Sequence, residues 1–95
     1  MYVRVINSQF VSGKEDEGLS VWRDNVAPGL KHTKGFKGAY VGGDRSTGKS
    51  VVITLWETED DANAMNVGLS QTLALFDGLL AAQPETNQYE VLLQV

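Results

Sequence analysis

The sequence contains no cysteine, one histidine and two prolines among its 95 residues. Without cysteine the chain has no disulfide framework, no thiolate metal site and no cysteine nucleophile. No apolar run approaches the roughly 18–20 residues that a membrane-spanning helix needs, and the polar N-terminus does not match a signal peptide. We therefore expect a cytoplasmic protein that does not bind or span a membrane.

Positive charge is also scarce. Eight basic against twelve acidic side chains give a formal charge of −4, so we expect no broad attraction to nucleic acid or to an anionic membrane. Hydrophobic residues make up 42% and charged residues 21% of the chain, which is the balance of an ordinary globular protein. We expect residues 1–95 to form a single domain with a thin core, because short chains bury a limited share of their surface.

Four segments have the composition of strands and two have the pattern of helices. The strands are expected at residues 2–10, 36–43, 50–57 and 88–95. Ser12 and Glu15 have the spacing of a capping box ahead of a first helix, in which Pro28 should cause a kink or a change of register. A second helix is expected behind the capping hydroxyl of Thr58, with a break or bend at Gly68 and an end near residue 82.

This order, β-α-β-β-α-β, predicts an α+β protein with a ferredoxin-like fold and an antiparallel sheet. Within it, the right-handed crossover rule favours strands 2–10 and 50–57 side by side and parallel. The strand 50–57 is apolar on both faces, with Val51, Ile53 and Leu55 on one and Val52 and Trp56 on the other. Such a strand needs cover on both sides, and the helices supply only one. We therefore predict a homodimer through the sheet face, which forms a dimeric α/β barrel.

The segment Gly43–Ser50 matches the phosphate-loop pattern G-x-x-x-x-G-K-[S/T]. That motif works only where a helix follows it, because the free amides at the start of the helix hold the phosphates. Here the residues after Ser50 are β-branched and aromatic and predict a strand. We interpret the segment as a hairpin turn and reject nucleotide binding.

The segments Lys34–Gly38 and Val52–Ala62, with the hairpin between them, resemble the antibiotic-biosynthesis-monooxygenase (ABM)-like family of dimeric α/β barrels. This family includes cofactor-free oxygenases of polycyclic aromatics, haem-degrading enzymes and proteins without known activity. The resemblance implies a pocket between sheet and helices. In a cofactor-free oxygenase, an electron-rich aromatic substrate itself reduces oxygen there, while the protein orients it, stabilises an anion and excludes water.

Two positions match those of the haem-degrading members, Asn7 on the first strand and Trp56 at the end of the third. They are neighbours if both of their faces point at the helices, and we take them as the candidate catalytic residues. The iron-ligating histidine of those members is absent, because Met65 and Asn66 stand near its position and the single histidine is His32. Haem degradation is therefore the lesser alternative, and no metal or cofactor is expected.

Further side chains with aromatic rings or polar tips are candidates for binding a small apolar or aromatic molecule: Trp22, Tyr40, Thr54 and Phe76. Several of the candidates have a competing structural explanation: both tryptophans suit a core, Asn7 suits a backbone hydrogen bond, and Tyr40 could as easily face the partner subunit. The carboxylates at 57–61 are better explained by the start of a helix than by a metal. Two functions stay open: a monooxygenase of an apolar aromatic compound, and a non-catalytic dimer that binds a small ligand or serves as an accessory protein.

Overall fold

The computed structural model describes all residues from 1 to 95 and contains four strands and a layer of short helical segments. The elements, in chain order, are β1 (Tyr2–Gln9), α1 (Glu15–Val21), the π-helical turn η1 (Trp22–Val26), α2 (Ala27–Leu30), β2 (Phe36–Gly43), β3 (Lys49–Trp56), α3 (Glu59–Asn63), the 3₁₀ turn η2 (Ala64–Asn66), α4 (Leu69–Ala74) and β4 (Glu85–Glu90).

The strands form one sheet in the order β2-β3-β1-β4, and every neighbouring pair is antiparallel. The ferredoxin-like α+β fold is thereby confirmed. The expectation that the first and third strands run parallel is wrong, because Tyr2 pairs with Trp56 and Gln9 with Lys49. The helical crossover returns β2 in the direction of β1, and the hairpin then reverses the chain, so β3 enters between them antiparallel to both.

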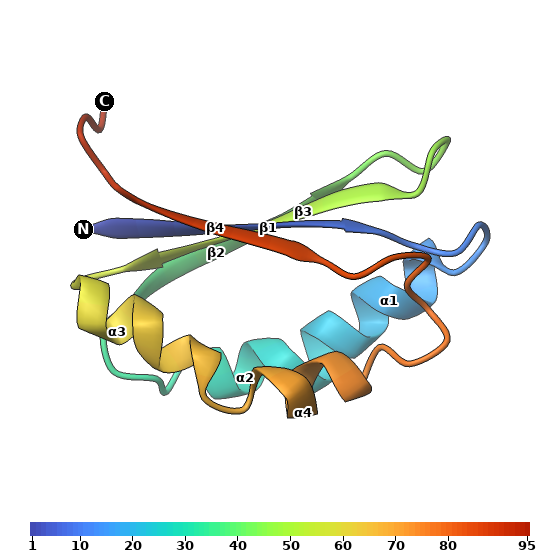
Figure 1. The fold of residues 1–95 in the computed structure, drawn as a ribbon, viewed down its shortest axis with the longest axis horizontal. Helices are drawn as coiled ribbons and strands as arrows, with labels where there is room; N and C mark the ends of the chain where they lie inside the picture. The colour runs from blue at the N-terminus through green and yellow to red at the C-terminus, as the bar shows by residue number, and fades with distance from the viewer.

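All the helices lie along one face of the sheet, and the opposite face is bare (Figure 1). We call the covered side the inner face and the bare side the outer face. The sheet of the single chain is open rather than closed into a barrel. On β3 the inner face carries the buried Val52, Thr54 and Trp56, while Val51 and Ile53 on the outer face stay half-exposed. The prediction that this strand is apolar on both faces is confirmed.

Pro28 determines the shape of the first helical segment. It has no amide hydrogen and its ring would clash with the carbonyl of Asp24 in a regular helix. The chain relieves this clash by widening one turn, so that the amide of Ala27 donates to the carbonyl of Trp22 five residues back. The predicted change of register is confirmed, and it occurs beside Trp22.

The predicted capping box at the start of this helix is wrong. The residue that precedes α1 is Lys14, and no side chain caps the helix. Gly13 adopts a positive φ of 84°, and the amide of Lys14 donates to the carbonyl of Val11. This turn separates Ser12 from the first helical residues, so its hydroxyl does not reach them.

The second helical segment begins as predicted and ends early. The hydroxyl of Thr58 accepts a hydrogen bond of 3.1 Å from the amide of Asp61, and Gly68 breaks the helix with a φ of +78°. Helix α4 then stops at Ala74, short of the expected end near residue 82. The chain turns there so that Leu80 can form a bridge with Phe10 at the end of β1.

The last strand is shifted from its expected position at 88–95. Strand β4 pairs only with β1, and its final pair is Glu90 with Tyr2, so residues beyond Val91 have no strand to join. Leu92, Leu93 and Val95 are more than 80% exposed. This apolar tail turns away from the helices at the C-terminus (Figure 1).

The packed core is small, with 11 of 95 residues buried. At its centre Trp56 is fully enclosed, and Leu30 and Ala62 pack with it. The ring of Phe36 packs edge-on against that of Trp56, with 5.5 Å between the ring centroids. These contacts lie at one end of the inner face, where β1 begins and β3 ends. None of the helices has the length and apolar character that crossing a membrane requires.

Candidate ligand-binding site

A cavity of about 290 Å³ lies between the inner face and the helices, at the end of the sheet away from Trp56. Its apolar walls come from both layers. Ile6 of β1 and Val52 of β3 form the sheet side, while Trp22 of η1 and Leu73 of α4 lie on the helix side together with Phe76. Further lining residues are Leu19, Phe10, Val41, Leu69, Leu80 and Thr86. The cavity is therefore enclosed mainly by aliphatic and aromatic side chains.

Two hydroxyl groups supply the polar contacts on the sheet side of the cavity. Ser8 and Ser50 are paired across β1 and β3, and their Oγ atoms lie 2.5 Å apart. Either hydroxyl can donate to the other, which leaves one hydrogen available for a ligand. A bound molecule with a polar edge thus has a hydrogen-bond donor on the sheet side of a largely apolar cavity.

The hairpin turn between β2 and β3 forms the rim of the cavity. Arg45 from this turn forms an ion pair with Asp16 of α1, and Gln9 of β1 donates to the carbonyl of Thr47. Gly48 has a φ of +78°, and a Cβ there would lie 2.8 Å from the carbonyl oxygen of Phe10. The turn therefore contacts β1 and α1 closely enough to require a glycine.

Asp44 organises the turn itself. Its Oδ1 accepts hydrogen bonds from the hydroxyl of Ser46 at 2.6 Å and from the amide of Ser46 at 2.9 Å. These bonds, the side-chain bond first, lower the pKa of Asp44. The phosphate-loop pattern is thus a hairpin turn, as predicted, and Ser50 continues into β3 where a nucleotide site would need a helix.

A row of polar side chains crosses the inner face of the sheet, one pair beyond the cavity-lining residues Ile6 and Thr86. We call Thr54, Arg4 and Gln88 the polar row, because they are paired on β3, β1 and β4. Arg4 is 3% exposed and Thr54 4%. Along the strands, the row lies between Trp56 in the packed core and the cavity-lining Ile6 and Thr86.

The structure brings Trp56 and Thr54 together, in the core. The indole Nε1 of Trp56 donates a 2.9 Å hydrogen bond to Oγ1 of Thr54, and neither residue lines the cavity. Met65 packs against the same core. The only polar atom of the Trp56 ring is therefore already used within the fold.

Asn7 does not meet Trp56. It is paired with Val51, is exposed, and lies on the outer face, so the condition that both faces point at the helices does not hold. Tyr40 also lies on the outer face, opposite Ile53, and is 70% exposed. Of the candidates chosen from sequence, Trp22 and Phe76 line the cavity.

Sequence reasoning missed the lining residues Ser8 and Ser50 and the buried Arg4 on the same inner face. A usable signal was present, because Arg4 shares strand parity with Ile6 and Ser8, and a charged residue within an apolar strand is unusual. Strand parity alone did not show which of these residues face the helices, because that depends on the antiparallel register of β1 with β3. His32, beyond the end of α2, is exposed and does not line the cavity.

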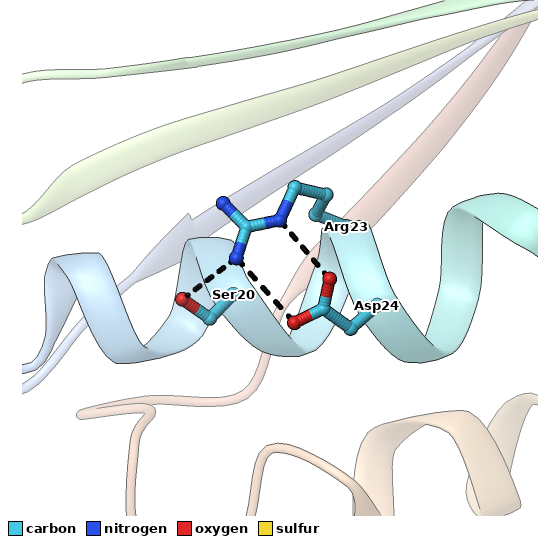
Figure 2. Close-up of polar contacts among 3 residues, drawn as sticks. All are labelled: Ser20, Arg23 and Asp24. Atoms are coloured by element: carbon cyan, nitrogen blue, oxygen red, sulfur yellow. Dashed lines mark hydrogen bonds and ion pairs between the residues drawn. The ribbon is translucent and has the colours of Figure 1, made fainter.

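A second group of polar contacts lies on the surface of the first helical segment (Figure 2). Nε of Arg23 donates to Oδ1 of Asp24 at 3.0 Å, and Nη2 of Arg23 is 3.5 Å from the hydroxyl of Ser20. The hydrogen bond between Arg23 and Asp24 raises the pKa of Arg23 and lowers that of Asp24. Both side chains are more than half exposed, and neither lines the cavity. This ion pair belongs to the helix surface.

Comparison with known proteins shows a fold shared with ABM proteins. No protein-family model matches the sequence, and no curated protein matches it. A monooxygenase of Streptomyces coelicolor, ActVA-Orf6, solved with nanaomycin D, has a TM-score of 0.79 at 15% identity, over 99% of this chain and 89% of its own. SnoaB, a cofactor-independent oxygenase of Streptomyces nogalater, gives 0.78 at 18% identity, over 99% and 96%.

A third structural neighbour is the haem degrader MhuD of Mycobacterium tuberculosis, solved with two haems in its active site. It gives a TM-score of 0.77 at 19% identity, over 100% of this chain and 99% of its own. At these identities the likeness shows the fold, and it supports the ABM-like resemblance noted in the sequence. The cavity lining of this chain contains no histidine, cysteine, tyrosine or methionine, so the residues present do not fit a haem iron.

Proposed function

We propose that this protein binds a small, flat, apolar molecule in the cavity between its sheet and its helices. The observation that carries the proposal is the cavity itself, with Trp22 and Phe76 among its apolar walls and the Ser8–Ser50 hydroxyls on its floor. Protein sites for small molecules combine largely apolar walls with a few placed polar groups. Its volume of about 290 Å³ is just below the usual range for such sites, about 300–1,000 Å³, which favours a small ligand of two or three fused rings.

Binding of the neutral fluorescent probe N-phenyl-1-naphthylamine tests this proposal. We expect its fluorescence to rise on binding to the wild type and to stay low with Leu73→Trp, because the larger ring occupies the cavity. Gln71→Trp is the matched control, since Gln71 is on the same helix α4, is exposed and does not line the cavity. Equal binding by both variants, or none by the folded wild type, would refute a ligand site here.

A second candidate function is oxygenation of the bound molecule by O₂ without a metal or cofactor. The observation that favours it is the shared fold with ActVA-Orf6 and SnoaB, which are a monooxygenase and a cofactor-independent oxygenase. For an activated methylene between aromatic rings, O₂ converts CH₂ to C=O, and the second oxygen atom leaves as water with the two hydrogens. The substrate supplies all four electrons, so the protein needs only to orient the ring, favour its anion and exclude water.

Oxygen uptake with anthrone separates the two functions. An oxygenase consumes O₂ and forms the quinone faster than buffer does, and Leu73→Trp abolishes the increase while Gln71→Trp retains it. A protein that binds the neutral probe but leaves anthrone oxidation at the buffer rate is a binding or accessory protein. Asn7→Ala and Trp56→Phe, the variants suggested by sequence, should leave uptake unchanged in folded protein, because neither side chain lines the cavity.

We further propose that two copies of the chain pair through their outer faces, which would complete the dimeric α/β barrel. The central part of this face is uncharged: its side chains include Val3, Val5, Val51, Ile53 and Leu55. The chain carries a formal charge of −4, so two copies meet with least repulsion through such a neutral surface. The exposed apolar tail after β4 turns toward the same side (Figure 1), which favours a second copy as the occupant.

A further inference from the structure

Arg4 is the only buried basic side chain of the protein, and it has no acidic partner. It is 3% exposed, and none of the four ion pairs in the structure includes it. Its acceptors are neutral amide oxygens: Nη2 donates to Oδ1 of Asn66 at 2.9 Å, and Nη1 donates to Oε1 of Gln88 at 3.4 Å. Gln88 in turn donates to Asn63, another neutral amide, at 2.8 Å.

A buried cation surrounded by neutral groups is unfavourable, and proteins usually pair such a charge with an anion. Burial lowers the pKa of Arg4 from its ordinary value, with no anion acting in the opposite direction. An arginine nevertheless stays protonated in proteins, so the charge is not removed by loss of a proton. The site is therefore one that an external anion would complete.

Arg4 does not line the cavity, but it occupies the strand position next to residues that do. Ile6 and Thr86 are paired across β1 and β4 and line the cavity, and the next pair on the same face is Arg4 with Gln88. Adjacent pairs on one face are about 7 Å apart along the strands, which is less than the length of a naphthalene-sized ligand with one substituent. Asn66, the other partner of Arg4, lies three residues before Leu69, which also lines the cavity.

We propose that the ligand of this cavity carries an anionic oxygen group, a carboxylate or an ionised phenol, and that Arg4 binds it. This inference rests on the proposed function. The apolar rings lie between Trp22, Phe76 and Val52, and the anion points along the inner face to the polar row. The flat guanidinium offers paired donors that match a carboxylate, which favours this class of ligand over a neutral ring.

Two basic residues line the cavity itself, both at its rim: Lys49 and Arg45. Lys49 is exposed, and Arg45 is exposed and already paired with Asp16. Both charges are screened by water and salt, so each is worth less to an anion than a buried guanidinium. They supply the control for a charge preference that arises at the rim.

The test uses 2-naphthoate and 2-naphthamide, which share ring and shape and differ in charge, measured by calorimetric titration of the full chain. The wild type should bind the carboxylate about tenfold or more tightly than the amide, as expected for a hydrogen bond to a charged group. Arg4→Met should bind both equally and keep the wild-type affinity for the amide. Lys49→Gln should keep the preference for the carboxylate.

The other possible results of these titrations contradict different parts of the proposal. Absence of binding of either probe by folded wild type contradicts the proposed function itself. Equal binding by the wild type contradicts only the anionic ligand, and a preference that survives in Arg4→Met, or disappears in Lys49→Gln, contradicts the role of Arg4. If Arg4→Met does not fold, Arg4→Lys keeps the charge without the paired donors, and an unchanged preference there rules out recognition by the guanidinium fork.

Discussion

Trp56 illustrates how much of a side chain's role is determined by what surrounds it. Its ring is fully enclosed, packs with Leu30, Ala62 and Phe36, and uses its single donor on Thr54. The resemblance of the sequence to the ABM-like family suggested a catalytic role for this tryptophan. In this chain the surroundings of Trp56 are those of a core residue.

Shortening Trp56 should therefore affect stability more than ligand binding. Trp56→Ala should lower the free energy of unfolding by about 3–5 kcal/mol, because it leaves a large void in a small core. Trp56→Phe should lower it by less, since most of the ring is kept while Thr54 loses its partner. Urea denaturation measures both losses. A folded Trp56→Phe protein of wild-type stability that no longer binds 2-naphthamide would show that the ring belongs to the ligand site.

Asp44 provides a prediction about pH. Its folded pKa is lowered, mainly by the Ser46 hydroxyl, so its contribution to the turn is fully present above the ordinary carboxyl pKa, about 4. That contribution is lost as the pH falls through the lower folded value. The amide resonance of Ser46 should thus titrate below the usual aspartate range, and Ser46→Ala should move the midpoint upward. A midpoint in the ordinary range for the wild type would contradict these hydrogen bonds.

At the scale of elements, the hairpin turn at the rim of the cavity depends on Gly48. Both its positive φ and its distance to the carbonyl of Phe10 disfavour a side chain. Gly48→Ala should lower the free energy of unfolding by about 1–3 kcal/mol, from backbone strain and from displacement of the turn.

A matched control for Gly48→Ala is Gly29→Ala in α2, where an added Cβ meets nothing within 4 Å and φ is not positive. This variant should be neutral or slightly stabilising, because alanine is the better helix former. Thermal unfolding of both proteins provides the measurement. A neutral effect at Gly48 would mean that the turn is free to move away from β1.

Local signals predicted the elements where a single residue forces the backbone. Pro28 predicted the change of register, Thr58 the helix cap, and Gly68 the break, because each acts through its own atoms on adjacent turns. Ser12 misled, because Gly13 redirected the chain before the helix began. The last strand was misplaced because its limit is the length of its partner β1, which no residue within 88–95 reveals.

The site was less predictable than the fold for a related reason. Strand parity groups Asn7 with Val3 and Val5, but it does not say which group faces the helices. That choice depends on the antiparallel pairing of β1 with β3, which places Asn7 opposite Val51. Because the face of Asn7 was assumed to point at the helices, the exposed Asn7 was chosen as a candidate and the buried Arg4 was not. Trp22 and Phe76 were found because the expected helical spacing placed them on the side that faces the sheet, although Phe76 lies in the turn after α4.

For the molecule as a whole, the inner and outer faces of the sheet have different requirements. The inner face is divided by the polar row into a packed core and a cavity, so only part of it contributes a closely packed interior. The outer face has no cover within the chain. With so few buried residues, the free monomer should be of low stability, and a partner on the outer face would add the burial that it lacks.

This reasoning predicts that a charge at the middle of the outer face separates the two copies. Ile53 is at the centre of β3, between Val5 of β1 and Tyr40 of β2, so Ile53→Lys would place two unpaired ammonium groups within the proposed interface. Sedimentation at micromolar concentration should give about twice the chain mass of 10.3 kDa for the wild type and the single mass for this variant. Val67→Lys is the matched control: Val67 is 86% exposed on the helical side, so this substitution should leave the dimer intact.

Removal of residues 91–95 should weaken the dimer without unfolding the chain, because the tail makes one backbone hydrogen bond to its own chain, from Val91 to Met1. A wild-type chain that sediments as a stable monomer would mean that its outer face is stable in contact with solvent, and this result would contradict the proposed dimeric barrel.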